Sequence, residues 1–370
     1  KQLITSIGLM SGTSCDGIDV SIIQSDGEDK LDILGEYYHQ YNEKLQQEIS
    51  NLKEKILRKE DLNIHSVDIS ELEKKITITH ALAVEETLNK FKFDKKNIGI
   101  IGFHGQTIYH SFKNKISKQL ADGGLLSKLL SLDVIYDFRN KDIGNGGQGA
   151  PLTPIYHNLI QKKIKGYTPI VFVNIGGISN LTYIGSDKKL LSFDTGPGNN
   201  LIDKFLKIKS NNKIHYDEDG AIAKKGFADE IILESYLNDS YYDLQPPKTL
   251  DVNDFSISPI RGLSFENSVS TLTELTARTI VNSFFLLPEK PKQIILCGGG
   301  RKNKFITERI KKLSQIKTNN IDEYELNGDF IESQAFAYLA IRSLLNKKIS
   351  FPETTGVKKS ISGGELIKFK

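Results

Sequence analysis

The chain has 370 residues, of which 38% are hydrophobic and 26% are charged, so it is too long for one typical core and suits two domains. Its 49 basic and 46 acidic residues leave a formal net charge of +3, which gives no electrostatic footprint for nucleic acid or a membrane surface. No apolar stretch reaches the roughly 18 residues of a membrane span. Nothing near residue 1 resembles a signal peptide, and Cys15 and Cys297 cannot form a disulfide framework. We therefore expect a cytoplasmic protein.

The first half of the chain predicts a three-stranded antiparallel meander followed by helices and further strands. The predicted strands cover residues 3–10, 18–24, 31–38, 98–103 and 133–136, and the predicted helices cover 43–59, 70–91 and 123–132. The first turn of the meander, residues 11–17, is rich in hydroxyl groups and glycine.

The second half repeats this pattern about 165 residues further on. The predicted strands cover residues 169–175, 178–184, 189–194 and 293–297, and the predicted helices cover 201–207, 268–287, a run from 303, and 329–345. This spacing is too long for a solenoid repeat and suits a duplicated domain. We expect an α/β protein with two similar lobes facing each other across a cleft.

Three glycine turns that follow predicted strands could bind phosphate. They are SGTSCDG at 11–17, DTGPGNN at 194–200 and CGGG at 297–300. Backbone N–H groups in such turns, and the open N–H groups expected at the start of the helix at 201–207, are suited to phosphate oxygens. An aspartate beside glycine or threonine could hold Mg²⁺ through water. The turns therefore predict a nucleotide bound between the lobes.

The loop at 137–149 combines charged side chains with four glycines before an apolar helical pattern begins. Glycines let the backbone approach a ligand, and the carboxylates and Arg139 supply acid–base and anion-binding groups. The alternative is a glycine-rich turn with solvated charges. The G-x-G-x-x-G spacing from Gly144 to Gly149 lacks the strand and acidic residue of a dinucleotide fold, and no P-loop pattern occurs.

Motifs along nearly the whole chain carry a family resemblance. They read IGLMSGTSCDGIDV at 7–20, GFHGQTIYH at 102–110, DFRNKDIGNGGQGAPL at 137–152, NIGGISNLT at 174–182, FDTGPGNNLID at 193–203, PPK at 246–248, TLTELTA at 271–277, CGGGRKN at 297–303, IESQAFAYLAIR at 331–342 and PETTG at 352–356. In this order they resemble the 1,6-anhydro-N-acetylmuramic acid kinases. That family belongs to the superfamily of sugar kinases, Hsp70 and actin.

The resemblance implies a duplicated two-lobed, actin-like ATPase fold, related to ribonuclease H, with a central ATP cleft. We expect a first lobe of residues 1–140 with 346–370 and a second lobe of residues 141–345. The implied reaction opens the 1,6-anhydro ring of 1,6-anhydro-N-acetylmuramic acid with water and phosphorylates O6. It would yield N-acetylmuramic acid 6-phosphate and ADP, in peptidoglycan recycling and amino-sugar catabolism.

The resemblance also implies site residues, with Asp142 as the catalytic base. The residues implied to bind ATP are Gly12, Thr13, Ser14, Cys15, Asp16, Gly17, Ile18, Asp19, Thr195, Gly196, Gly198, Asn199, Gly298, Gly299 and Gly300. Those implied to line the sugar pocket are His104, Gln106, Arg139 and Glu332. Asp16 and Glu332 would hold Mg²⁺, and a homodimer is implied.

Two alternatives stay open at the level of sequence. The first is a kinase for another 1,6-anhydrosugar, such as levoglucosan, which lacks the N-acetyl and lactyl groups. The second is a nucleotide-switched binding module related to actin or the chaperones. Such a module would turn over ATP without a small sugar.

Overall fold

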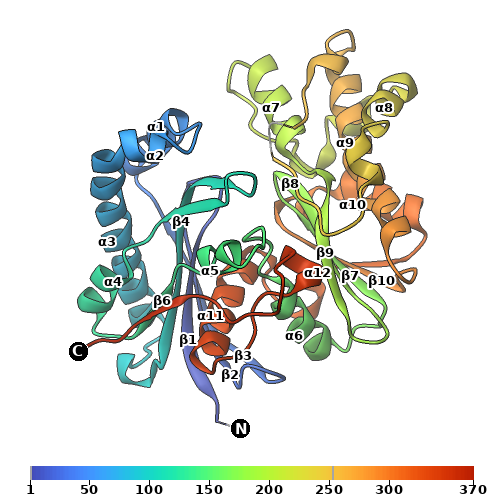
Figure 1. The fold of residues 1–370 in the computed structure, drawn as a ribbon. Helices are drawn as coiled ribbons and strands as arrows, with labels where there is room; N and C mark the ends of the chain where they lie inside the picture. Colours follow the sequence, from blue (N-terminus) through green and yellow to red (C-terminus); the bar gives the residue numbers. More distant parts are fainter. Residues whose placement is uncertain (1, 252–253) are drawn as a thin grey trace. The chain divides into compact units, whose positions relative to one another are not determined.

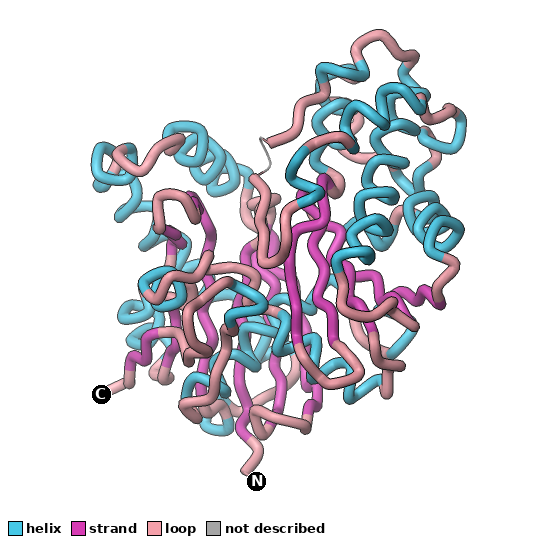
Figure 2. Tube along the Cα trace, turned by 45° about the vertical axis from the view of Figure 1, so that its right-hand side comes forward, coloured by secondary structure: helices cyan, strands magenta, loops and turns pink. Residues whose placement is uncertain are grey.

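The computed structural model describes residues 2–251 and 254–370. The chain forms two compact units, residues 1–163 with 330–370 and residues 164–329. Each unit contains one β-sheet and several helices (Figures 1 and 2). The α/β class expected from the sequence is therefore confirmed.

The first unit is built on a seven-stranded sheet with the strand order β12-β6-β4-β1-β2-β3, in which β5 pairs with β4. Its strands are β1 (Ile4–Ser11), β2 (Gly17–Ser25), β3 (Leu31–Gln40), β4 (Ile100–Ser111), β5 (Ile116–Leu120), β6 (Val134–Tyr136) and β12 (Glu365–Ile367). Strands β1, β2 and β3 form the antiparallel meander predicted from the sequence, and β4 and β6 continue the sheet in parallel with β1.

Helices cover both faces of this sheet, with α3 and α4 on one side and α11 on the other (Figure 1). The helices of the unit are α1 (Glu43–Lys55), α2 (Asp61–Ile64), α3 (Ser66–Lys90), α4 (Gly123–Leu130), α5 (Asn140–Gly144), α6 (Pro154–Ile164), α11 (Ile331–Leu344) and α12 (Pro352–Thr355). Successive side chains of a strand point to opposite faces. Ile7 and Leu9 of β1 lie in the core with α3, whereas Gly8 faces α11.

The second unit has a five-stranded sheet with the order β11-β10-β7-β8-β9. Its strands are β7 (Ile170–Ile175), β8 (Ile178–Ile184), β9 (Leu190–Pro197), β10 (Gln293–Cys297) and β11 (Lys317–Asn320), and its α-helices are α7 (Asn200–Lys209), α8 (Glu230–Leu237), α9 (Phe265–Asn282) and α10 (Lys304–Ser314). Strands β7, β8 and β9 form an antiparallel meander, and β10 pairs with β7 in parallel. The antiparallel meander thus occurs in both units, as the sequence repeat predicts, and in each unit a later strand pairs in parallel with the first strand of the meander.

The structure differs from the expected elements in several places. Strand β4 runs on to Ser111 instead of ending at Phe103, because its second half pairs with β5, which the sequence did not predict. Helix α5 and strands β11 and β12 were also not predicted. The expected changes of lobe at 140/141 and 345/346 do not match the division into units at 163/164 and 329/330. Residues 330–345 belong to the first unit because α11 packs on β1, β2 and β4.

Candidate active site

Asp142 lies in the first turn of α5, and its side chain is 1% exposed. Each of its carboxylate oxygens accepts one hydrogen bond. The Gly149 N–H donates to Oδ1 over 2.8 Å, and the Thr355 hydroxyl donates to Oδ2 over 2.6 Å. A carboxylate can accept about four hydrogen bonds. Asp142 is therefore oriented by two neighbours and keeps lone pairs with which to take a proton.

The glycine loop after α5 allows the backbone to lie against this carboxylate. A Cβ atom on Gly147 would stand 2.0 Å from Oδ1 of Asp142, far inside van der Waals contact. The Gly147 N–H also donates to the Asp142 carbonyl over 2.9 Å. The glycines of this loop are thus needed for close packing around Asp142. A glycine-rich turn with solvated charges, the alternative left open by the sequence, would not need them.

His104 and Arg139 form a buried pair in the same unit. The His104 ring donates from Nδ1 to the Gly105 carbonyl over 2.8 Å, and its Nε2 accepts from Arg139 Nε over 3.0 Å. Burial, and next the Arg139 charge, hold the pKa of His104 well below its usual value. His104 is therefore neutral, and its proton is on Nδ1.

Arg139 links this pair to Asp142 and Glu332. Its Nη1 donates to the carbonyl of Gly149 over 2.8 Å, and the N–H of the same glycine donates to the Asp142 carboxylate. Burial lowers the pKa of Arg139, while the charges of Glu332 and Asp142 raise it. Glu332 itself stands in the first turn of α11 with an exposed side chain. The first unit therefore gathers four of the predicted residues, Asp142, Arg139, His104 and Glu332.

The turn between β1 and β2 carries the predicted first phosphate motif. Thr13, Ser14 and Asp16 are exposed, and the Ser14 hydroxyl donates to Asp16 Oδ1 over 2.6 Å. Gln106, predicted for the sugar pocket, donates from Nε2 to the Gly12 carbonyl over 2.9 Å, and its buried Oε1 has no hydrogen-bond partner among the described residues. The structure thus places Gln106 against the phosphate turn.

Three other residues of this motif are less accessible than the sequence suggested. Ile18 is 0% exposed and belongs to the hydrophobic core, so its side chain is not available to a nucleotide. Cys15 is buried, and Lys53 Nζ lies 3.5 Å from its Sγ. Burial raises the pKa of the Cys15 thiol, and the Lys53 charge partly opposes that rise. Asp19 lies within β2, paired with Met10 and Tyr38.

In the second unit, the predicted phosphate motif spans the end of β9 and the start of α7. Thr195 is in β9, and its hydroxyl donates to the Ser179 carbonyl over 3.2 Å. The N–H groups of Gly198 and Asn199 donate to the carbonyls of Gly177 and Gly176 over 2.9 and 2.8 Å. The β7–β8 turn therefore already occupies the N–H groups of the two residues just before α7.

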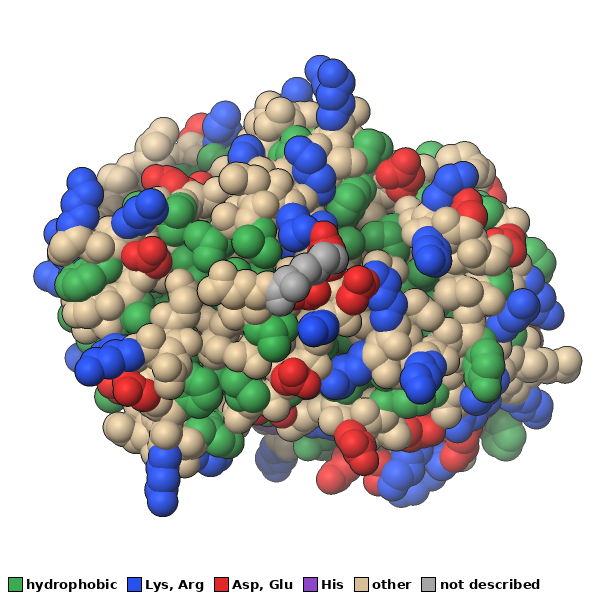
Figure 3. All heavy atoms as spheres, turned by 90° about the horizontal axis from the view of Figure 1, so that it is seen from below, with side chains coloured by type: hydrophobic (Ala, Val, Ile, Leu, Met, Phe, Trp, Pro, Cys, Tyr) green, Lys and Arg blue, Asp and Glu red, His purple; other side chains and the backbone are tan. Residues whose placement is uncertain are grey.

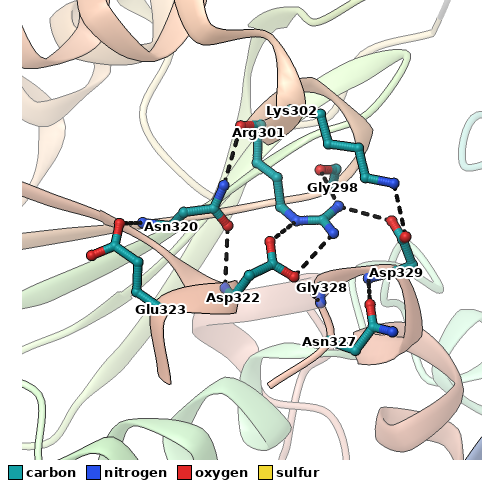
Figure 4. Close-up of polar contacts among 9 residues, drawn as sticks. All are labelled: Gly298, Arg301, Lys302, Asn320, Asp322, Glu323, Asn327, Gly328 and Asp329. Carbon is teal, nitrogen blue, oxygen red and sulfur yellow. Dashed lines mark hydrogen bonds and ion pairs between the residues drawn. The ribbon is translucent and has the colours of Figure 1, made fainter. Parts of the chain in front are cut away.

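The glycines after β10 are supported by a buried arginine (Figure 4). Arg301 is 4% exposed and donates to the Gly298 carbonyl over 3.0 Å. It also contacts Asp322 over 2.6 Å and Asp329 over 3.0 Å. Gly298 has a φ of +75°, and a Cβ there would stand 2.3 Å from Oδ1 of Asn174. The predicted nucleoside-side turn, Gly298 to Gly300, therefore has a fixed backbone shape.

Sequence reasoning missed two polar residues beside this second motif. Asp194 precedes Thr195, and burial raises the pKa of its carboxyl to about 7. Lys248 of the PPK motif is 6% exposed, and burial lowers the pKa of its ammonium to about 8. Asp194 lies in the FDTGPGNNLID motif and Lys248 lies in the PPK motif. The signal in the sequence was a charged side chain between two uncharged neighbours.

The two residues expected to hold Mg²⁺, Asp16 and Glu332, are both exposed carboxylates. Within residues 2–251 and 254–370, no group of three or more His, Cys, Asp and Glu side chains is arranged to hold a metal. Mg²⁺ bound with a nucleotide commonly uses one or two carboxylates together with phosphates and water. The exposed carboxylates of Asp16 and Glu332 fit that donor set. In the same ranges, no helix is long and apolar enough to cross a membrane.

Glycine turns at strand ends in both α/β units, together with an oriented buried carboxylate, are features of an ATP-dependent kinase for a small molecule. The chain belongs to the anhydro-N-acetylmuramic acid kinase family, whose model matches residues 4–368.

Relatives that bear the same description match over almost their full length. The anhydro-N-acetylmuramic acid kinase of Pelagibacter ubique is 46% identical, over 100% of this chain and 99% of its own. That of Zymomonas mobilis is 37% identical, over 98% and 99%. Among solved structures, a xylulose kinase from Lactobacillus acidophilus aligns with a TM-score of 0.40 at 12% identity, over 92% of this chain and 89% of that one.

Proposed function

We propose that the protein uses ATP to phosphorylate O6 of 1,6-anhydro-N-acetylmuramic acid while water opens the anhydro ring, giving N-acetylmuramic acid 6-phosphate and ADP. Family membership supports both the reaction class and the sugar. The observation that carries the mechanism is the Asp142 carboxylate, buried and oriented by Gly149 and Thr355. Nothing in the comparisons favours levoglucosan.

The substrate explains why the base must act on water. O6 of an anhydrosugar is bonded to C1 of the same ring, so it has no proton for a base to remove. Asp142 instead takes a proton from a water that attacks C1. The C1–O6 bond breaks, and the freed O6 attacks the γ-phosphorus of ATP. Proton removal by a positioned carboxylate typically contributes about 10²–10⁴-fold to a rate.

The neighbours of Asp142 support this role. Arg139 keeps a positive charge near the carboxylate and bonds the same residue, Gly149, that donates to it. Neutral His104 accepts from Arg139 and so fixes the direction of the guanidinium. We assign both side chains to the sugar pocket, together with Gln106 and Glu332.

On the ATP side, we assign the β1–β2 turn to one set of phosphates and the Thr195–Asn199 and Gly298–Gly300 segments to the other phosphates and the nucleoside. Asp16 and Glu332 would hold Mg²⁺, which supplies charge neutralisation to the transferring phosphoryl group when bound. The N–H groups of Gly198 and Asn199 already donate to the β7–β8 turn. We therefore assign to these two residues the role of fixing the backbone of the Thr195–Asn199 segment.

We further propose a homodimer that works in the cytoplasm. The cytoplasm provides ATP, and its reducing conditions suit the two free cysteines, Cys15 and Cys297. On the face drawn in Figure 3, lysine and arginine side chains are interspersed with aspartate and glutamate side chains. Such a mixed surface favours a small-molecule substrate over a polyanionic partner.

The proposal is tested by ADP release from Mg-ATP in the presence of three sugars. The assay compares 1,6-anhydro-N-acetylmuramic acid, levoglucosan and ordinary N-acetylmuramic acid, with a sample that lacks sugar. We expect turnover with the first sugar only. Turnover with levoglucosan alone would move the assignment to that substrate, and sugar-independent turnover would indicate a nucleotide-switched binding module instead.

A further inference from the structure

The β1–β2 turn, which we assign to phosphates of ATP, is held in place through its carbonyl groups. The Gln106 side-chain amide and the Cys15 N–H donate to the Gly12 carbonyl over 2.9 and 3.2 Å. The Tyr41 N–H donates to the Asp16 carbonyl over 2.8 Å. These hydrogen bonds fix the shape of the turn and leave the side chains of its exposed residues free of that task.

Helix α1 brings a charged donor to this turn. Lys53 stands in the last turn of α1, and its Nζ lies 3.4 Å from the Thr13 carbonyl oxygen and 3.5 Å from Cys15 Sγ. The oxygen contact is longer than the usual range for an N–H···O hydrogen bond. The same carbonyl also accepts from the Cys15 thiol over 3.4 Å. The ammonium is therefore close to the turn but only weakly bonded to it.

Lys53 has no carboxylate partner. Within residues 2–251 and 254–370, no Asp or Glu side chain lies at ion-pair distance from its ammonium. In contrast, Lys55, two residues further along α1, lies 3.8 Å from Asp68. An ammonium has three N–H donors, and the two long contacts leave at least one of them open. Lys53 thus presents an unpaired positive charge at the turn.

This charge is placed for the terminal phosphates of a nucleotide. Asp16 of the same turn is the residue that we assign to Mg²⁺, and in phosphoryl transfer the metal bridges oxygens of the β- and γ-phosphates. The phosphates nearest this turn are then the terminal ones. A lysine ammonium makes short, charge-assisted hydrogen bonds to phosphate oxygens and acts on them as a point charge.

We propose that Lys53 binds a terminal phosphate of ATP, its ammonium exchanging the Thr13 carbonyl for a phosphate oxygen at the β1–β2 turn. This inference rests on the proposed kinase function. It adds to the nucleotide site a residue of α1 that lies outside all the motifs that carry the family resemblance, and it does not depend on how the sugar ring is opened.

Nucleotide binding in the absence of sugar tests this role. Lys53→Met keeps the length of the side chain and removes its charge and donors. We expect the Kd of Mg-ATP to rise roughly 10-fold, the lower end of the effect of losing a hydrogen bond to a charged group. The Kd of AMP, which lacks the terminal phosphates, should change by less than about twofold. The matched control is Lys55→Met, which should leave both Kd values unchanged.

Steady-state kinetics supply a second comparison. Lys53→Met should raise the KM for ATP and leave the KM for the sugar within about twofold, and Lys53→Arg, which keeps the charge, should recover part of the loss. An equal rise in Kd for ATP and AMP, or an equal effect of Lys55→Met, would overturn the proposal. Helix α1 would then support the turn without contacting the terminal phosphates.

A measurement without nucleotide tests whether Lys53 lies beside the turn in solution. The Lys53 charge opposes the rise in the pKa of Cys15 that burial causes. Lys53→Met should therefore raise this pKa further, because an opposite charge favours the thiolate. Alkylation of Cys15 by iodoacetamide at pH 8, followed by mass spectrometry of its peptide, should slow in Lys53→Met and not in Lys55→Met.

The alkylation result separates this inference from the kinase assignment. Equal alkylation rates in the wild type and Lys53→Met would overturn the placement of Lys53. A wild-type protein that binds no nucleotide, yet shows the difference in alkylation, would overturn the proposed function and leave only the contact of Lys53 with the turn. A wild-type protein that binds Mg-ATP no more tightly than Lys53→Met does would overturn the inference alone.

Discussion

Asp142 depends on two donors from different parts of the chain. Gly149 lies seven residues further along the same loop, whereas Thr355 lies 213 residues away. The sequence predicted the aspartate and its glycines because they are close together in the chain. The threonine could not be paired with the aspartate from the sequence, because only folding brings α12 beside α5.

Thr355→Val tests the value of that hydroxyl. We expect kcat to fall roughly 10- to 100-fold, because a hydrogen bond to a charged group is worth about 1.5–3 kcal/mol, with little change in the KM for ATP. The control is Thr354→Val, since the Thr354 hydroxyl bonds Phe351 and not Asp142. Steady-state kinetics of both variants measure the difference, and an equal effect of the two would contradict the assignment of Thr355.

The raised pKa of Asp194 predicts a pH dependence of stability. Its folded pKa of about 7 exceeds the ordinary aspartate value of 3.8, so the folded state binds more protons between these values. The stabilisation is complete below about pH 4 and is lost as the pH rises through about 7. Asp194→Asn removes this contribution to stability. Urea midpoints at pH 5 and pH 8 should therefore fall less in the variant than in the wild type, and equal falls would contradict the buried carboxyl.

At the scale of elements, α11 lies directly on the central sheet of the first unit. A Cβ on Gly102 of β4 would stand 2.2 Å from the Phe336 carbonyl, and one on Gly8 of β1 would stand 1.8 Å from the Ser333 carbonyl. Both glycines therefore admit the helix backbone. Because α11 packs here, Glu332 in its first turn lies close enough to Arg139 for its charge to raise the pKa of the guanidinium.

Gly102→Ala should destabilise the protein because the new methyl group meets helix backbone that cannot move aside. We expect a loss of about 1–3 kcal/mol in the free energy of unfolding, typical of overpacking. Gly262→Ala is the control, since a Cβ there meets nothing within 4 Å. Urea denaturation compares the two variants with the wild type, and equal stability of both variants would contradict the close packing of α11.

The sequence predicted most long elements and fewer short ones. The two meanders and the helices at α3, α9 and α11 were found because their apolar periodicity is sustained over many residues. Helix α5, with 5 residues, and strand β12, with 3 residues, were missed. Such short segments are stabilised by tertiary contacts, for example those of Asp142 with Thr355, which leave no periodic pattern.

For the whole molecule, the repeated pattern predicted two lobes, and the expected boundaries at 140/141 and 345/346 differ from those of the two units. The loop that follows residue 140 is bonded to α12 of the same unit, as in the hydrogen bond from the Gln148 N–H to the Thr355 carbonyl over 2.8 Å. The site was predicted more completely in the first unit, where its residues lie in short motifs. In the second unit, the bond from Arg301 to Asp329 and the bond from Tyr241 to Asp194 join residues that lie 28 and 47 positions apart.

The central claim is that Asp142 activates a water that attacks C1 while O6 receives the phosphoryl group. The most direct measurement is mass spectrometry of the product formed in ¹⁸O-labelled water and quenched early, before the anomeric oxygen exchanges with solvent. We predict one ¹⁸O atom at C1 and none in the phosphate ester for each ADP formed, and no labelled product from Asp142→Asn. An unlabelled C1, or undiminished product from Asp142→Asn, would contradict the account.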